Sequence, residues 1–251
     1  MKIGNYKMCG ISGFISTKHN LETKINNTLR LMSSRGPDHQ KYVKFKVKKK
    51  QINLLHSRLS IIDLQKRSNQ PFKIGNYTII FNGEIYNYLE VRENLKKKNY
   101  QFQTNSDTEV LLNSYIEYKE DCFKYLNGMW SFAIWNEKDN TLFLSRDPFG
   151  EKPLYYTFDG EDFFFGSEIK YLFSLSNSKK YLNQSKINHY LFDGYKSICS
   201  DNKTFYKNVY SLPPGSYLKI NLENNYKIKK YYNLSFENSR SEKLDIEEIV
   251  N

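Results

Sequence analysis

The sequence has 251 residues, of which 39% are hydrophobic, 16% are aromatic and three are cysteine. A chain of this length and composition can bury a large core without disulfides or a structural metal. The cysteines lie at unrelated spacings, with no Cys-x-x-Cys pair or Cys/His cluster, which argues against a disulfide scaffold and a zinc site. We therefore expect a globular protein in a reducing, cytoplasmic compartment.

The charge balance is basic, with a net charge of +11 and two lysine runs, 48–50 and 96–98. Such an excess would permit an anionic partner. No recognisable motif interleaves basic with stacking aromatic residues, so we expect no nucleic-acid partner. No run of 18 apolar residues is present, and residues 1–8 lack an apolar stretch of signal-peptide length, so we expect neither a membrane segment nor secretion.

The first half of the chain alternates predicted strands with predicted helices. Apolar runs and period-two alternation predict strands over residues 9–15, 43–47, 52–57 and 77–81. Helical spacing of apolar residues predicts helices over 21–32 and 89–95. The strand over 77–81 is expected to stop at Asn82-Gly83-Glu84 and to deliver these residues to a sheet edge. Ser106 and Glu109 have the spacing of a capping box, which places Asp107 in the first turn of a helix.

The second half reads as an antiparallel sheet region. Short strands separated by turn residues are predicted over 129–135, 141–145, 154–158 and 163–166, with two more after the rigid turn at 212–216. Short helices are expected over 167–175 and 183–192, and the polar segment 238–251 is typical of a linker or a helix start. Many antiparallel strands with helices at intervals predict an α+β fold of two packed sheets flanked by helices.

Four short segments carry residues suited to chemistry. They are Met8-Cys9-Gly10-Ile11, residues 56–63 (His-Ser-Arg-Leu-Ser-Ile-Ile-Asp), residues 81–87 (Phe-Asn-Gly-Glu-Ile-Tyr-Asn) and Ser106-Asp107. Nucleophilic catalysis needs a nucleophile and a base, and often hydrogen-bond donors for an oxyanion. A thiol with a pKa of about 8.5 is mostly protonated at neutral pH, whereas an α-amino group titrating near about 8 can accept its proton. A cysteine at a chain start therefore carries its own base.

In this order the four segments resemble the class II glutamine amidotransferase domain, specifically the N-terminal half of glutamine-dependent asparagine synthetase. The resemblance runs from Cys9 to about Tyr232, and it also takes in residues 35–38, 128–129, 146–156, 167–168 and 212–215. It implies the N-terminal-nucleophile (Ntn) hydrolase fold, a four-layer α/β/β/α sandwich of two antiparallel sheets flanked by helices. The chain would then divide into an extension at 1–8, the amidotransferase domain at 9–232 and a linker at 233–251.

The resemblance gives Cys9 the catalytic role. Its thiol would attack the side-chain amide of L-glutamine, release ammonia and leave a thioester that water converts to glutamate. A buried structural cysteine is the alternative for a lone residue of this type. Asn82 and Gly83 would form the oxyanion hole, since they offer a side-chain amide and an unobstructed backbone N–H. An Asn-Gly pair by itself is more often a hairpin turn.

The charged ends of glutamine also find partners by resemblance. Arg58 would bind the α-carboxylate with a planar, two-pronged donor. Glu84 and Asp107 would hold the α-ammonium, although Asp107 could also serve as a favourable charge at a helix N-terminus. His56 is expected to be a hydrogen-bonded structural residue, because the amine already supplies a base. Cys122 and Cys199 are expected to be small buried hydrophobes.

The chain departs from the family pattern at its start, where seven residues precede Met8. If Met1 is retained, the nitrogen of Cys9 is a peptide amide without a basic lone pair, and leader residues would block the pocket. Three alternatives follow: translation starts at Met8, a short propeptide is removed, or the chain is inactive.

A second departure concerns the synthetase half of the family, which binds ATP through a Ser-Gly-Gly-x-Asp-Ser loop. This chain has no Gly-Gly pair. We therefore expect no cofactor and no metal in the chain itself, with ATP and Mg belonging to a separate synthetase domain or subunit that acts on aspartate. A homodimer is a further possibility.

Two rival functions remain open at this point. One is a glutaminase domain that serves another acceptor, such as a sugar, because related amidotransferases share this N-terminal half. The other is a non-catalytic regulatory module that keeps the fold without the chemistry.

Overall fold

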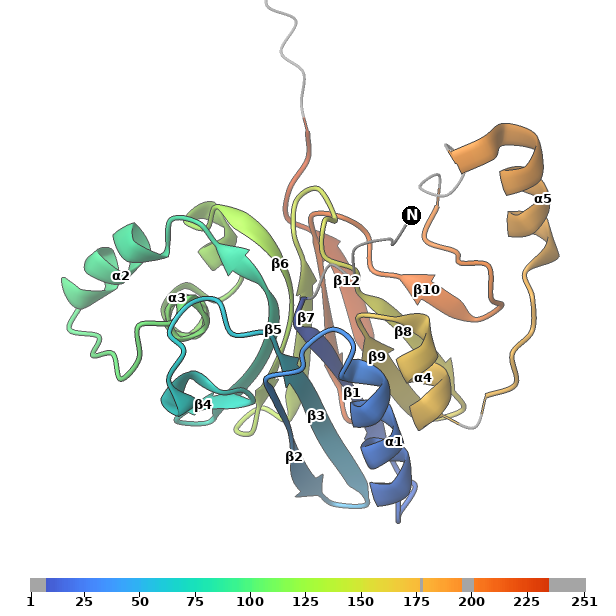
Figure 1. Ribbon diagram of the computed structural model, residues 1–251, viewed down its shortest axis with the longest axis horizontal. Helices are drawn as coiled ribbons and strands as arrows, with labels where there is room; N and C mark the ends of the chain where they lie inside the picture. The colour runs from blue at the N-terminus through green and yellow to red at the C-terminus, as the bar shows by residue number, and fades with distance from the viewer. Residues whose placement is uncertain (1–7, 177, 196–200, 235–251) are drawn as a thin grey trace, which may run out of the picture.

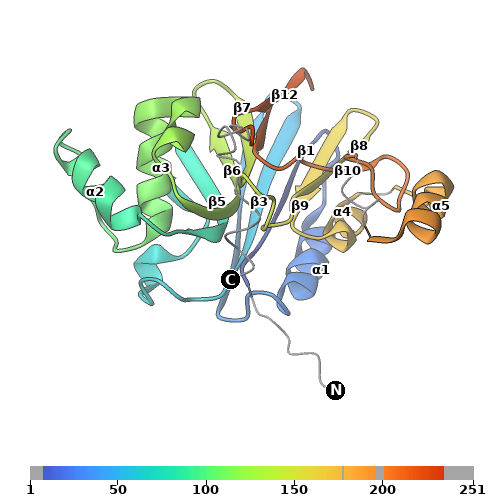
Figure 2. The same ribbon diagram turned by 90° about the horizontal axis from the view of Figure 1, so that it is seen from above.

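The computed structural model describes residues 8–176, 178–195 and 201–234. These residues form two six-stranded sheets that pack face to face, with helices on their outer sides (Figures 1 and 2). Every strand pairing recorded in this part of the chain is antiparallel. The predicted extension, apart from Met8, and most of the predicted linker lie outside the described residues, as does Cys199.

The first sheet contains the strand that follows Cys9. Its order is β10 (Val209–Ser211), β8 (Tyr155–Asp159), β9 (Asp162–Gly166), β1 (Gly10–Ser16), β3 (Lys50–Arg58) and β2 (His39–Val47). The predicted hairpin over 43–57 is confirmed as the β2–β3 pair, in which Val43 lies opposite Leu54. The central position of β1, between β9 and β3, explains why its seven residues are all buried.

The second sheet contains the strand that carries Asn82, Gly83 and Glu84. Its order is β12 (Tyr226–Lys230), β11 (Ser216–Asn221), β7 (Thr141–Arg146), β6 (Gly128–Asn136), β5 (Tyr77–Ile85) and β4 (Phe72–Ile74). Consecutive strands β5, β6 and β7 are neighbours, so this half of the sandwich is built largely from local connections.

Helices cover the outer face of each sheet, which makes four layers (Figure 2). Helices α1 (Glu22–Met32) and α4 (Ile169–Leu175) bury Ile25, Met32 and Leu172 against the first sheet. Helices α2 (Tyr88–Lys96) and α3 (Asp107–Tyr118) cover the second sheet, and α5 (Gln184–Asp193) lies at the side of the molecule (Figure 1). Two short 3-10 helices, η1 (Lys66–Ser68) and η2 (Lys119–Lys124), complete the set.

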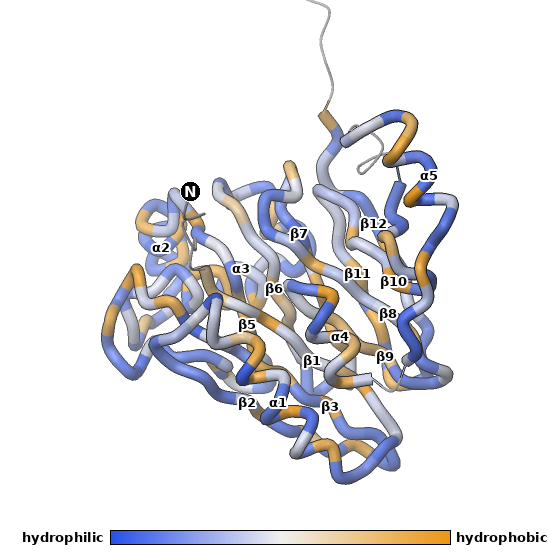
Figure 3. The backbone as a smooth tube through the Cα atoms, turned by 45° about the vertical axis from the view of Figure 1, so that its right-hand side comes forward, coloured by the Kyte–Doolittle hydropathy of each residue, from blue (hydrophilic) through white to orange (hydrophobic). Residues whose placement is uncertain are grey.

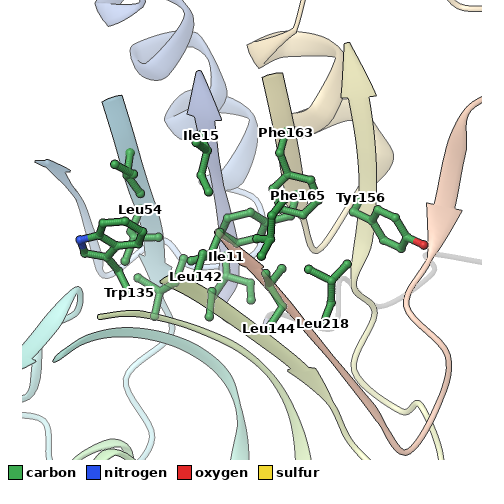
Figure 4. Packing of buried hydrophobic residues seen from close by; sticks show 14 of the residues in the cluster. Ile11, Ile15, Leu54, Trp135, Leu142, Leu144, Tyr156, Phe163, Phe165 and Leu218 are labelled. Carbon is green, nitrogen blue, oxygen red and sulfur yellow. The ribbon is translucent and has the colours of Figure 1, made fainter. Parts of the chain in front are cut away.

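The main core lies between the two sheets. Ile11 and Leu54 of the first sheet point toward Trp135 and Leu144 of the second, and all four side chains are at most 1% exposed (Figure 4). Each large apolar side chain buried in this way contributes about 1.5–3 kcal/mol to folding. Figure 3 shows how hydropathy differs between central and edge strands: β9 is largely apolar, whereas much of the edge strand β2 is polar.

Strand β5 extends further than the sequence indicated. Instead of stopping at Asn82, it continues through Ile85, and Asn82, Gly83 and Glu84 pair with Ser131, Trp130 and Met129 of β6. A Cβ at position 83 would collide with the carbonyl oxygen of Met129, so the two strands can approach closely here only because residue 83 is glycine. The prediction that these residues follow the strand was therefore wrong, because they are paired residues within it.

Only one of the two hydrogen bonds of the predicted capping box forms at the start of α3. The Ser106 hydroxyl accepts a hydrogen bond from the Thr108 N–H at 3.0 Å. Glu109 does not return to Ser106 as in a capping box. Its carboxylate accepts the N–H groups of Gln103 and Thr104 at 2.8 and 2.7 Å, which fixes the loop before the helix.

Candidate active site

One pocket brings together all six candidate residues. Cys9, Arg58, Asn82, Gly83, Glu84 and Asp107 line it. Cys9 and Arg58 come from the first sheet, at the start of β1 and the end of β3, whereas Asn82 to Glu84 come from the end of β5 in the second sheet. The pocket therefore lies where the ends of the two sheets meet, and the first turn of α3 closes it with Asp107.

Cys9 is fixed through both its side chain and its backbone. The Leu59 N–H donates to Sγ at 3.3 Å, and the thiol is 3.5 Å from the Leu59 carbonyl oxygen. The Nε of Arg35 donates to the Cys9 carbonyl oxygen at 2.9 Å, and the same guanidinium pairs with Glu168 at 3.4 Å. Burial raises the pKa of the thiol, although the hydrogen bond to Leu59 and the charge of Arg58 oppose this shift. The thiol therefore needs a base to become a nucleophile.

Met8 is bonded to the Cys9 nitrogen, which is the atom that would serve as that base. Its peptide bond makes the nitrogen of Cys9 an amide, and its own N–H donates to the Arg35 carbonyl oxygen at 3.0 Å. Met8 lines the pocket, with its Sδ 3.3 Å from the Nζ of Lys152. A residue that precedes Cys9 therefore takes space inside the pocket, as the sequence suggested for a retained leader.

Asn82 and Gly83 face the pocket from within β5. Asn82 is only 1% exposed, and its Nδ2 is 3.4 Å from the Oγ of Ser131 on the neighbouring strand. That long contact leaves the amide with a second N–H for a ligand. Gly83 lines the pocket beside it, and the atoms that a Cβ at this position would meet belong to Phe81 and to β6.

Asp107 lies where both roles considered for it are open to it. It lies in the first turn of α3, where a negative charge is favourable, and it also lines the pocket. Its Oδ2 accepts the Ile85 N–H at 3.1 Å. Burial nevertheless raises the pKa of Asp107 to about 6, against the opposing effect of its hydrogen bonds, and the nearby charge of Glu84 adds to the rise.

Arg58 is committed to the protein more fully than the sequence suggested. Its Nη1 donates to the Gln65 carbonyl and to Asn69 Oδ1, at 3.3 and 2.7 Å. Its Nη2 donates to the carbonyls of Ile62 and Asp63, at 3.2 and 2.5 Å. Both Nη atoms thus hold the loop after β3, and Nε is the donor that remains. The guanidinium places a positive charge at the pocket wall and shapes that wall at the same time.

His56 has the structural role expected for it. It is completely buried, and its Nε2 is 3.1 Å from the Phe81 carbonyl oxygen. Because burial lowers the pKa of His56 to about 3, the ring is neutral at physiological pH, so Nε2 carries the proton and donates it to Phe81. This hydrogen bond joins β3 to β5 and thereby connects the two sheets at Phe81, which lines the pocket.

The pocket lining also includes residues that the sequence did not assign a role, among them Gln70, Met129 and Lys152. Gln70 accepts the Phe81 N–H at 2.6 Å and donates to the Thr108 hydroxyl at 3.2 Å, so it connects β5 to α3. Lys152 and Met129 belong to segments of the family resemblance, but no local pattern distinguishes a buried lysine or methionine from an exposed one. These contacts depend on the tertiary fold.

The comparison with protein families agrees with this geometry. A family described as a glutamine amidotransferase domain matches residues 8–232, which is most of the chain. The chain belongs to this glutamine amidotransferase family.

Curated relatives of this amidotransferase domain include several asparagine synthetases. "Asparagine synthetase [glutamine-hydrolyzing] 3" from Bacillus subtilis is 43% identical over 175 residues, which cover 65% of this chain and 27% of the relative. "Asparagine synthetase [glutamine-hydrolyzing] 1" from the same organism is 37% identical over 94% of this chain and 37% of its own length. A putative asparagine synthetase from Methanocaldococcus jannaschii is 36% identical over 90% of this chain and 46% of its own length. The amidotransferase chain thus spans less than half of each relative.

Solved structures show the same fold. A glutamine phosphoribosylpyrophosphate amidotransferase from B. subtilis superposes with a TM-score of 0.65 and 18% sequence identity, covering 90% of this chain and 50% of the other. The predicted Ntn hydrolase sandwich is therefore confirmed for the amidotransferase domain. Among its described residues, no group of three or more His, Cys, Asp or Glu side chains is placed to hold a metal ion. No helix in the described ranges has both the length and the apolar character needed to cross a membrane.

Proposed function

We propose that this amidotransferase domain hydrolyses the side-chain amide of glutamine, with Cys9 as an N-terminal nucleophile. One observation carries the proposal: the six residues suited to this chemistry come from two sheets and a helix, and they line a single pocket. Separate structural roles for these residues would not require them to meet.

The reaction divides into two steps. The free α-amine of Cys9 takes the thiol proton, directly or through one water, and Sγ attacks the amide carbon of glutamine. The Asn82 amide and the Gly83 N–H stabilise the oxyanion, and the proton passes to the departing nitrogen, which leaves as ammonia. Water, deprotonated by the same amine, then hydrolyses the thioester to glutamate and restores the thiol.

The remaining pocket residues would hold the amino-acid end of the substrate. Glu84 and Asp107 provide carboxylates for the α-ammonium. Arg58 offers its charge and its Nε to the α-carboxylate, because both Nη atoms already hold the 62–69 loop. This arrangement replaces the two-pronged contact expected from the sequence with a single hydrogen bond and a fixed positive charge.

The mechanism requires a form of the protein in which Cys9 carries a free amine. An amide nitrogen has no basic lone pair, and Met8 takes space in the pocket. Translation from Met8 with methionine removal, or cleavage of a short propeptide, would each produce this form. Intact-mass measurement of the native protein tests this point, and a mass that retains the residues before Cys9 in an active preparation would contradict the mechanism.

The acceptor of the ammonia is a further proposal. The asparagine synthetases that resemble this chain are more than twice its length. We propose a partner domain or subunit that uses ATP and Mg to activate aspartate, with another acceptor, such as a sugar, as the alternative. Adding the candidate partner, ATP and either acceptor to the domain, and measuring which aminated product forms, separates the two.

Glutamate release from glutamine is the direct test of the proposal. A preparation beginning at Cys9 should release glutamate and ammonia, and Cys9→Ala should abolish both. Cys122→Ala is the matched control, because this free cysteine is buried between the second sheet and helices α2 and α3 and does not line the pocket. Equal rates for Cys9→Ala and the parent would refute the mechanism, and a folded parent without activity would favour the regulatory-module alternative.

A further inference from the structure

Lys152 places a positive charge inside the pocket without a close carboxylate partner. The residue is 8% exposed and lines the pocket beside Met8. The acceptor recorded for its Nζ is the Met8 thioether sulfur at 3.3 Å, and no ion pair is recorded for it among the described residues. A thioether is a weak acceptor that carries no charge. Burial accordingly lowers the pKa of Lys152, because the ammonium loses water without gaining a close carboxylate.

The position of this lysine is set by its backbone. Its N–H donates to Asp147 Oδ2 at 2.9 Å, and its carbonyl oxygen accepts from Arg146 Nε at 2.8 Å. The Asp147 carboxylate, which is fully buried, also accepts the N–H groups of Phe149 and Glu151 at 3.1 and 3.0 Å. The loop after β7 is thereby folded around one carboxylate, and the Lys152 side chain leaves it toward Met8.

We propose that Lys152 is a positioning residue whose charge holds the freed α-amine of Cys9 in its neutral, basic form. This inference rests on the proposed glutaminase function. Met8 is bonded directly to Cys9, and the Lys152 ammonium that contacts the side chain of Met8 lines the same pocket as Cys9. A neighbouring positive charge disfavours a second one, and the amine therefore binds its proton less tightly.

The need for such a charge follows from the ordinary pKa of an α-amino group. This value is about 7.7–8.0, so only about one tenth of the amine is neutral at pH 7. Burial raises the pKa of the Cys9 thiol, so the thiol cannot ionise without help. A pKa of the amine lowered by one unit would bring the neutral fraction to about one half at pH 7, a gain of about fivefold in active enzyme.

Other charges face Cys9: one arginine in an ion pair, one arginine hydrogen-bonded to neutral oxygens, and one carboxylate. The Arg35 guanidinium pairs with Glu168 and with the Cys9 carbonyl. Arg58 is surrounded by oxygen acceptors from its own loop. Asp107 lines the same pocket and favours a protonated amine.

The acidic residues around Lys152 act at a greater distance than a salt bridge. The charges of Glu151, Asp147 and Glu84 favour its protonated form without an ion pair at close range, while Arg35 disfavours it. Of the two cations that line this pocket, Arg58 has four recorded oxygen acceptors, whereas no oxygen acceptor is recorded for the Lys152 ammonium among the described residues.

The test compares Lys152→Met and Lys152→Gln, which remove the charge, with Lys152→Arg, which keeps it. Each protein begins at Cys9, as verified by intact mass, and folding is checked by circular dichroism. The measured quantity is kcat/KM for glutamine hydrolysis between pH 5.5 and 9. Lys44→Met is the matched control, because Lys44 lies on the edge strand β2, away from the pocket.

The two neutral variants should shift the acidic limb of the profile upward by about 0.5–1 pH unit, while Lys152→Arg and Lys44→Met keep the parent's midpoint. The plateau at high pH should change by less than about threefold. An unshifted midpoint in the neutral variants overturns the inference, whether kcat falls equally at every pH, as for a structural residue, or KM alone rises, as for a substrate contact.

A second measurement distinguishes this inference from the proposed function. Nitrogen-15 NMR of protein labelled at cysteine reports the pKa of the Cys9 amine without substrate. A lower amine pKa in the parent than in Lys152→Met supports the inference even if glutamine is not hydrolysed, and equal values in both proteins refute it. An inactive parent with a free amine refutes only the glutaminase proposal.

Discussion

Asp107 accepts a hydrogen bond from the backbone N–H of Ile85, with 3.1 Å between Oδ2 and the nitrogen. This contact ties the first turn of α3 to the last residue of β5. The carboxylate proposed to bind the substrate ammonium is thereby held beside the strand end that carries Asn82, Gly83 and Glu84. The Asp107 carboxylate thus positions the strand end and is also proposed to bind the substrate. Its titration should therefore have two measurable effects.

The first effect is on substrate binding. The pKa of Asp107 is raised to about 6, so its charge is lost as the pH falls through this value. KM for glutamine should therefore rise below pH 6, by up to about tenfold per pH unit. Asp107→Asn should have a high KM at every pH without this transition. Steady-state kinetics between pH 5 and 8 check the prediction, which a flat KM for the parent would contradict.

The second effect is on stability. An aspartate carboxyl group ordinarily has a pKa of 3.8, whereas burial raises the pKa of Asp107 in the folded protein to about 6, so the folded state binds the proton more tightly. Its contribution to the free energy of unfolding is most favourable below pH 4 and falls as the pH rises to 6, by roughly 3 kcal/mol at most. Urea unfolding at pH 4 and 7 should show the parent losing stability relative to Asp107→Asn. Equal changes in both proteins would contradict the shifted pKa.

Asn82→Ala should lower kcat by about 10²- to 10³-fold, because one oxyanion donor is lost, while KM changes little. Single-turnover measurement of thioester formation gives the cleanest comparison. Ser131→Ala is the control, since Ser131 contacts the Asn82 amide at 3.4 Å but does not line the pocket. A kcat for Asn82→Ala close to that of the control would remove Asn82 from the oxyanion hole.

Gly83→Ala should destabilise the fold by about 1–3 kcal/mol and also reduce kcat, because the added methyl group meets the Met129 carbonyl and the Phe81 ring. Thermal unfolding and glutaminase kinetics measure the two effects. Gly75→Ala is the comparison, because Gly75 has a φ of +54° but open space around it. That variant should lose stability through its backbone alone and keep its kcat. A neutral Gly83→Ala would show that β6 can move away.

Arg58→Lys should raise KM by about 5- to 100-fold, because a lysine cannot hold four oxygen acceptors and the 62–69 loop loses its support. Limited proteolysis should cut this loop faster than in the parent. Arg67→Lys is the control, since the Arg67 side chain is 51% exposed and makes a single ion pair with Asp63, which a lysine can also make. Unchanged proteolysis of Arg58→Lys would mean that the loop is held by other contacts.

The sequence predicted those parts of the structure that depend on local pattern. Apolar periodicity located β1, the β2–β3 hairpin and α1, and Ser106 marked the start of α3. It did not reveal β4 and β10, which are three-residue strands completed by their partners. The length of β5 was missed for the same reason. Gly83 suggested that the strand ends there, whereas the structure shows that a glycine is needed because β6 passes close to it.

The candidate site shows a similar division. The motifs identified which residues to examine, and all six lie in one pocket. The bonding of Arg58 to its loop and the burial of Lys152 were not predictable, because both depend on segments brought together by the fold. The assignment of a reducing, cytoplasmic location stays a prediction from the cysteine spacing.

The hydrogen bond between His56 and Phe81 crosses from one sheet to the other, and Phe81 lines the pocket. The proposed nucleophile and the proposed oxyanion donors thus lie on different sheets, and the core between the sheets sets the distance between them. The rate of the proposed reaction therefore depends on how the two sheets are positioned relative to each other. A small displacement of one sheet against the other would lower this rate, even if the substrate contacts made by each sheet stayed intact.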